Sequence, residues 1–146
     1  MFYPYITISL IILFLTLSLG LYILFNKNRS VANRNFAFQI FSAVLWIFSN
    51  FMADISTDST TNLLWSKAAL IGPILIAYFF FHFSIEFPQK KIIKNYYKVV
   101  IFLIAITLII LSPTRLNVPE VRPTDGSFEM TPGFLYIPFL FYFLLM

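Results

Sequence analysis

The sequence predicts an all-α protein: a polytopic bundle of transmembrane helices with four complete spans, a partial fifth span and the N-terminus outside. Of its 146 residues, 60% are hydrophobic and only 11% are charged, whereas soluble domains carry about 25% charged residues. The apolar residues also stand in long blocks, which is typical of chains whose solvent is lipid. We therefore expect the lipid bilayer to be a partner, and the location to be the inner (cytoplasmic) membrane, crossed several times.

Two apolar blocks open the chain. The first, Tyr5 to Phe25, carries no charge, and as a helix it would cover roughly 31 Å, enough to cross a bilayer core. No charged segment precedes it and no small-residue cleavage site follows it, so we expect a retained anchor and not a cleaved signal. The second block, Phe36 to Ala53, is just long enough as a helix to span the bilayer core.

The third and fourth blocks differ in length. The third, Leu63 to Phe87, is long enough to tilt, with Lys67 near its first turn and Pro73 as a candidate kink. The fourth, about 96–112, is the shortest complete span, and it is extended by the snorkelling cation Lys98.

The fifth block, Phe134 to Met146, would reach only about 20 Å as a helix, against a hydrocarbon core of about 30 Å. A helix that ends inside lipid leaves its last carbonyl groups without partners, which is costly. An interfacial helix is one explanation. We favour the other, in which residues 1–146 are a fragment of a longer protein.

The basic residues predict the orientation, because loops rich in lysine and arginine face the cytoplasm. Three lie after the first block and four after the third, while the other gaps carry acidic residues as well. This places the N-terminus outside. The basic residues are Lys27, Arg29, Arg34, Lys90, Lys91, Lys94 and Lys98.

The long loop 113–133 then faces out. Its four prolines exclude a regular helix across it. The sequence TDGS, from Thr124 to Ser127, offers an Asp-Gly turn for a small hairpin. We expect this loop to cap the outer mouth of the bundle.

Six residues are candidates for ligand binding or sensing: Gln39, Trp46, Asn50, Tyr78, His82 and Glu86. Tyr78, His82 and Glu86 are spaced to share one face of the third helix, and ionisable residues within a span are often functional. Glu86 can equally lie at the cytoplasmic rim, and His82 can equally bond to a neighbouring helix. On the second block a polar stripe fits either interhelical hydrogen bonds or a ligand pocket. It contains Gln39, Ser42, Trp46, Ser49 and Asn50.

Several kinds of chemistry are excluded or disfavoured. The chain has no cysteine and one histidine, so it offers no thiolate nucleophile and no set of ligands for a metal or haem. It has no phosphate-binding glycine loop and no HExxH or GxSxG motif, so nothing indicates catalysis. The basic residues are scattered in short gaps, which disfavours nucleic acid. We expect no cofactor and no metal.

The order of these segments along the chain resembles that of a known family. A helix ending in LYILFNKNRSVANRNFAF precedes one with a central tryptophan in FSAVLWIFSNFM and another in LLWSKAALIGPILIAYFFFHFSIEFP. This order resembles the N-terminal seven-transmembrane (7TM) region of bacterial histidine kinases. The resemblance implies two further helices, a homodimer, and a cytoplasmic output that is a kinase or a diguanylate cyclase. The matching residues are Trp65, Lys67, Gly72, Pro73, Phe83, Glu86 and Phe87.

Two functions from different classes follow. The first is a sensory input domain in which an unknown small ligand shifts helix packing and the shift passes to a cytoplasmic enzyme. The alternative is a subunit of a small-solute transporter or channel, with His82, Glu86 and Asn50 along a path. Solute flux through the membrane would separate the two.

Overall fold

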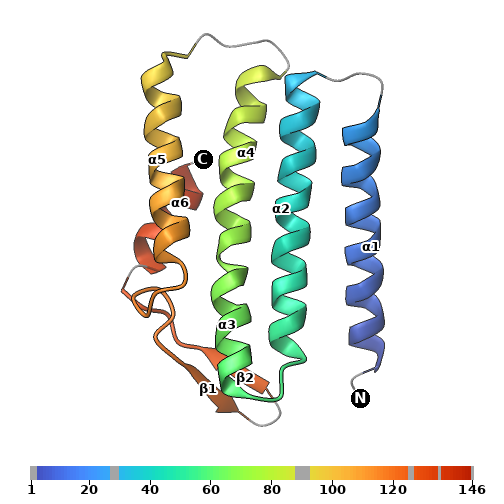
Figure 1. Cartoon of the computed structure of the whole chain (residues 1–146), viewed down its shortest axis with the longest axis vertical. Coiled ribbons are helices and arrows are strands. Elements are labelled where there is room, and N and C mark those ends of the chain that lie inside the picture. Colours follow the sequence, from blue (N-terminus) through green and yellow to red (C-terminus); the bar gives the residue numbers. More distant parts are fainter. Residues whose placement is uncertain (1–2, 27–29, 88–92, 125–126, 135, 146) are drawn as a thin grey trace.

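The computed structural model describes residues 3–26, 30–87, 93–124, 127–134 and 136–145. Within these ranges the chain is mostly helical, as predicted, and its long helices run up and down side by side (Figure 1). One small hairpin interrupts the helices. The elements are α1 (Tyr3–Phe25), α2 (Val31–Asp54), α3 (Ser59–Ala69), α4 (Ile71–Glu86), α5 (Asn95–Leu111), β1 (Val121–Thr124), β2 (Ser127–Met130) and α6 (Tyr136–Leu145).

Side-chain caps set the beginnings of α2 and α3. The hydroxyl of Ser30 accepts a hydrogen bond of 3.1 Å from the backbone N–H of Asn33, so α2 begins at Val31, before the apolar block predicted at Phe36. The carboxylate of Asp58 accepts one of 2.8 Å from the N–H of Thr61. This bond lowers the pKa of Asp58, so the cap stabilises α3 at neutral pH and is lost as the pH falls through that lowered pKa.

The predicted third span is two helices. It breaks at Leu70, between α3 and α4, where the sequence predicted at most a kink. Pro73 explains the break, because proline has no N–H to donate to the carbonyl four residues earlier, that of Ala69, and its ring crowds that carbonyl. The two helices lie end to end in nearly the same direction (Figure 1). Ser59–Glu86 as a whole is long and apolar enough to cross a membrane.

In the described part of the chain, three helical segments are long and apolar enough to span a bilayer: Tyr5–Phe25, Val31–Asp54 and Ser59–Glu86. The prediction of four complete spans is therefore confirmed for three. The fourth candidate, α5, is apolar but has 17 residues, which is about 26 Å of helix against a core of about 30 Å. α5 ends at Leu111, and Ser112, its C-cap, begins the loop.

Helix α2 lies between α1 and α4 (Figure 1). It meets α4 at backbone distance, because a Cβ atom added to Gly72 would lie 2.5 Å from Trp46 Cβ and 2.9 Å from Trp46 Cα. Such close approach of small residues is how helices associate in lipid, where no hydrophobic force drives them together. Towards the other end, two aromatic pairs join the same helices, each with ring centroids 5.3 Å apart. They are Phe36–Phe83 and Phe38–Phe79.

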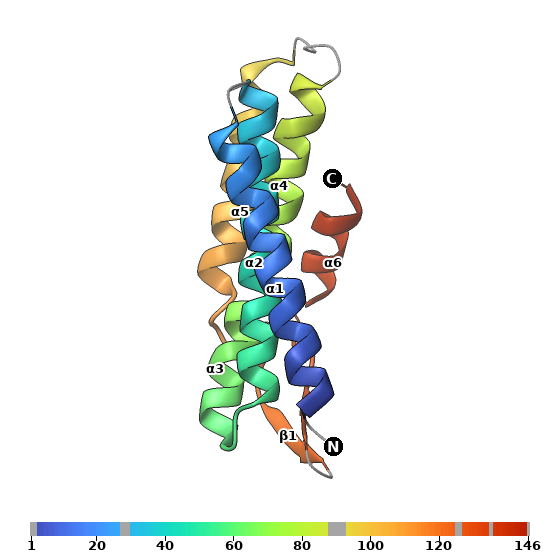
Figure 2. The same ribbon diagram turned by 90° about the vertical axis from the view of Figure 1, so that its right-hand side faces the viewer.

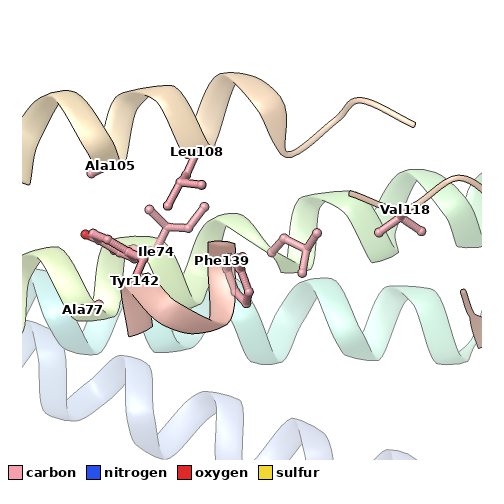
Figure 3. Close-up of a cluster of buried hydrophobic side chains, with 8 residues drawn as sticks. Ile74, Ala77, Ala105, Leu108, Val118, Phe139 and Tyr142 are labelled. Atoms are coloured by element: carbon pink, nitrogen blue, oxygen red, sulfur yellow. The ribbon is translucent and has the colours of Figure 1, made fainter. Parts of the chain in front are cut away.

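A second set of contacts joins α4, α5 and α6. Figure 3 shows Ile74 of α4 between Leu108 of α5 and the ring of Tyr142 of α6. The Tyr142 hydroxyl also donates a hydrogen bond of 3.3 Å to the Ile74 carbonyl. The cluster of buried residues is Leu70, Ile74, Ala77, Ala105, Leu108, Val118, Phe139 and Tyr142.

The loop after α5 folds over the end of the bundle that also holds the N-terminus (Figure 2). The predicted hairpin forms, with Val121 opposite Met130 in an antiparallel pair. The predicted turn at Asp125–Gly126 lies outside the described residues. The loop is tied to the helices by the Ser112 hydroxyl, which donates a bond of 3.0 Å to the Lys67 carbonyl.

We predict that Gly72→Ala destabilises the bundle by about 1–3 kcal/mol, because the new methyl group meets the Trp46 backbone and α2 and α4 must separate. Thermal unfolding in lipid nanodiscs measures the change. Gly20→Ala is the matched control, since its methyl group would lie 3.1 Å from the movable side chains of Ile40 and Phe41. Equal losses in the two variants would contradict a rigid contact at Gly72.

Candidate ligand-binding site

A cavity of about 360 Å³ lies at the hairpin end of the bundle. It is bounded by the last turns of α2, by α3, by the break between α3 and α4, by the end of β2 and by the first turns of α6. We call it the outer cavity. Its lining residues are Trp46, Asn50, Ala53, Asp54, Asn62, Ser66, Ala69, Leu70, Pro73, Met130, Tyr136 and Phe139.

One wall of the outer cavity is polar and held by its own hydrogen bonds. Asn62 is buried, and its Nδ2 donates a bond of 2.7 Å to the Ala53 carbonyl, which closes the turn between α2 and α3. The Ser66 hydroxyl donates to Asn62 Oδ1 at 3.2 Å. Asn50 Nδ2 donates to the Trp46 carbonyl at 2.8 Å. These bonds fix the orientation of both amides, and each amide keeps a second N–H donor beside its oxygen acceptor.

The charged group of the cavity is Asp54, the last residue of α2. Its carboxylate accepts a hydrogen bond from the hydroxyl of Tyr5, so α1 is tied to the rim of the cavity. A carboxylate at a helix C-terminus faces the negative end of the helix dipole. Neither Lys nor Arg nor His is among the described residues that line the cavity, so its charge is negative.

The helix break forms the inner boundary. Leu70 is buried, and Pro73 lines the cavity beside it. Because Pro73 carries no N–H, the Ala69 carbonyl loses its ordinary helical donor. Ala69 itself lines the cavity, so the helix break lies at the cavity wall.

The opposite wall is aromatic. Tyr136 and Phe139 of α6 stack with centroids 5.8 Å apart, and Trp46 of α2 also lines the cavity. Phe139 is buried, whereas Trp46 is 45% exposed. An occupant would therefore touch a polar wall from α2 and α3 and an aromatic wall that belongs partly to α6.

The six candidates from the sequence separate into groups. Trp46 and Asn50 line the outer cavity. The others lie away from it. Tyr78 packs against His82, with ring centroids 4.7 Å apart and ring planes tilted by 59°, and the buried His82 Nε2 has no partner among the described residues. Gln39 is partly buried on α2, and Glu86 is partly buried at the end of α4.

The sequence analysis missed most of the cavity. Asn62 and Ser66 are spaced by four on α3, a signal that could have been found, but the predicted third span began at Leu63. Met130 comes from β2 in the loop and Tyr136 from α6, and no periodicity links such segments to α2. Asp54 was assigned to a loop.

Other cavities are lined by fewer elements. One of about 320 Å³ lies at the opposite end, between the end of α1 and the start of α2, from Ile23 to Arg34. Another, of about 520 Å³, lies beside α3 and the Ser112 turn, with Lys67 as its charged group. The outer cavity differs because five elements, α2, α3, α4, β2 and α6, meet around a polar network that includes the buried Asn62.

The fold and the outer cavity are those of a multi-pass membrane protein with a pocket at one end of its helices. Residues 8–146 match the family model for the N-terminal 7TM region of histidine kinase, and the chain belongs to this family. The resemblance seen in the sequence is thereby confirmed. The region is a sensory module and not itself catalytic. No curated protein and no solved structure matches the chain.

We predict that Asn62→Ala destabilises the chain by about 1–3 kcal/mol, because α3 loses its hydrogen bond to the Ala53 carbonyl and the buried amide leaves a gap, while that carbonyl keeps the bond from the Ser56 N–H. Unfolding in nanodiscs, followed by the near-ultraviolet signal of the aromatic rings, measures the loss. Ser66→Ala is the control, since it removes one longer bond to Asn62 and should cost less than about 1 kcal/mol. A larger loss for Ser66→Ala would argue against Asn62 as the residue that closes the turn.

Proposed function

We propose that the chain is the ligand-sensing input domain of a receptor in the inner membrane, that the outer cavity binds the ligand, and that α6 carries the signal inward. The observation that supports this most strongly is the composition of the cavity wall. Residues of α2 and α3 lie on one side and Tyr136 and Phe139 of α6 on the other. A ligand that binds two elements favours one of their relative positions.

Contacts elsewhere support α6 as the element that moves. Its described side chains reach α4 through the Tyr142 hydroxyl and the rings around Ile74, and Figure 2 shows it lying along one side of the bundle. In contrast, α2 and α4 meet at backbone distance at Gly72. A shift of α6 therefore disturbs fewer contacts than a shift of α2.

The proposed output is a cytoplasmic signalling enzyme of the histidine kinase type, reached through helices that follow α6. In this topology the N-terminus and the hairpin are outside, α5 crosses as a fourth span with some local thinning of the bilayer, and two chains pair. The alternative of a transporter has less support, because the cavity lies at one end of the bundle and the family is a sensory one.

Filling the outer cavity should move α6. We predict that Ser66→Leu shifts the distance distribution between spin labels at Val31→Cys and Phe141→Cys, two exposed positions on α2 and α6. The chain has no cysteine, so pulsed electron paramagnetic resonance in nanodiscs needs no background mutation. Thr16→Leu on α1, which lies outside the cavity lining, is the control. An unchanged distribution in Ser66→Leu would refute the proposed coupling.

The orientation has its own test. We predict that a maleimide reagent applied to intact spheroplasts labels Thr57→Cys, in the turn between α2 and α3, and does not label Asn95→Cys at the start of α5. Both residues are exposed. After lysis both should react, which controls for reactivity. The reverse pattern would place the hairpin inside and remove the outer cavity from the extracellular medium.

A further inference from the structure

We propose that the ligand of the outer cavity is a small organic ammonium ion, with N–H groups and a short apolar body. This inference rests on the proposed function, because it names the chemical class that the same cavity takes. It is carried by three properties of the cavity: its charge, the balance of its hydrogen-bonding groups and its aromatic wall.

The charge of the cavity selects a cation. Asp54 is the ionisable carboxyl group among its described lining residues, and no basic side chain stands with it. The partner that the structure gives to Asp54 is the hydroxyl of Tyr5, which is neutral. Among the described lining residues, no cation is paired with this carboxyl group. An anionic occupant would be repelled and would find no counter-charge.

The hydrogen-bonding groups include acceptors that a donor ligand needs. Asn62 Nδ2 donates one of its two protons to the Ala53 carbonyl, and the Ser66 hydroxyl donates to Asn62 Oδ1. Asn50 Nδ2 donates to the Trp46 carbonyl of its own helix, which leaves Asn50 Oδ1 for a ligand. Each amide keeps a second N–H, so the polar wall offers donors as well as acceptors. An ammonium group, which has donors and no acceptor, fits the carboxylate of Asp54 together with Asn50 Oδ1.

The aromatic wall favours an organic cation over a metal ion. Trp46, Tyr136 and Phe139 line the cavity, and aromatic faces attract ammonium groups while their surfaces bury carbon. Divalent metals instead take several carboxylates or imidazoles. In the part of the chain that the structure describes, no three residues of His, Cys, Asp and Glu are grouped to hold one.

The test compares probes of matched size and different charge on the whole chain in nanodiscs, by calorimetric titration against empty nanodiscs. The probes are benzylamine, benzyl alcohol, benzoate and benzyltrimethylammonium, with sodium chloride alone to detect an inorganic cation. We expect saturable binding of benzylamine that is about tenfold tighter than that of benzyl alcohol. Benzyltrimethylammonium should bind more weakly than benzylamine because it has no N–H group, and benzoate should not bind.

Two variants assign the effect to the carboxylate. Asp54→Asn should weaken benzylamine about tenfold and leave benzyl alcohol unchanged, while its amide oxygen still accepts the bond from Tyr5. Tyr5→Phe removes that bond and keeps the charge, so it should bind benzylamine at least as well as the native chain. Loss of binding in Tyr5→Phe would mean that Asp54 acts only through its tie to α1.

The outcomes separate this inference from the proposed function. Equal binding of benzyl alcohol or benzoate, binding of sodium alone, no saturable binding of benzylamine, or a benzylamine affinity unaffected by Asp54→Asn would each overturn the ammonium class. None of these would touch the coupling of the cavity to α6, which Ser66→Leu tests without a ligand. Conversely, selective binding of benzylamine with no movement of α6 in Ser66→Leu would keep the ammonium site and refute its signalling role.

Discussion

The missing backbone N–H of Pro73 is the constraint on which the hairpin end of the molecule depends. Because Pro73 cannot donate to the Ala69 carbonyl and its ring crowds that carbonyl, the third helix does not continue as one regular helix. It breaks at Leu70. The broken turn then gives the Lys67 carbonyl to the Ser112 hydroxyl, which fixes the start of the loop that carries the hairpin and leads into α6. One proline thus links the third span, the cap and the last helix.

Close packing holds the inner half together. Gly72 lets α2 and α4 touch at the backbone, and the rings of Phe36, Phe38, Phe79 and Phe83 extend the contact towards the other end. Because the surrounding lipid is as apolar as these side chains, shape and contact area, rather than exclusion of water, stabilise the pair. The large exposed faces of α1 and α5 suit the same solvent.

Hydropathy predicted the positions of the helices well. It predicted their exact ends and the cavity between them poorly. The uncharged block from Tyr5 to Phe25 could only be a span, and α1 has nearly those bounds. The start of α2 was missed because Ser30 acts through a hydrogen bond, to which an average over apolar residues is blind. For the site, Trp46 and Asn50 were found from the spacing of polar residues on one helix. Tyr136 and Met130 could not be, since a cavity between distant segments leaves no periodic signal.

The single hydrogen bond from the Tyr142 hydroxyl to the Ile74 carbonyl bears on how sensitive such a receptor is. A hydrogen bond of this kind contributes about 1 kcal/mol net, only about twice the thermal energy at room temperature. The bond adds to the packing of Phe139 and Tyr142 in the buried cluster. In the proposed receptor, the pair of α2 and α4 is the fixed part, and the balance between two positions of α6 depends on these few contacts. A change of about 1 kcal/mol at this bond would then alter the ratio of the two positions several-fold, so the proposed receptor would be tuned by single contacts of its last helix.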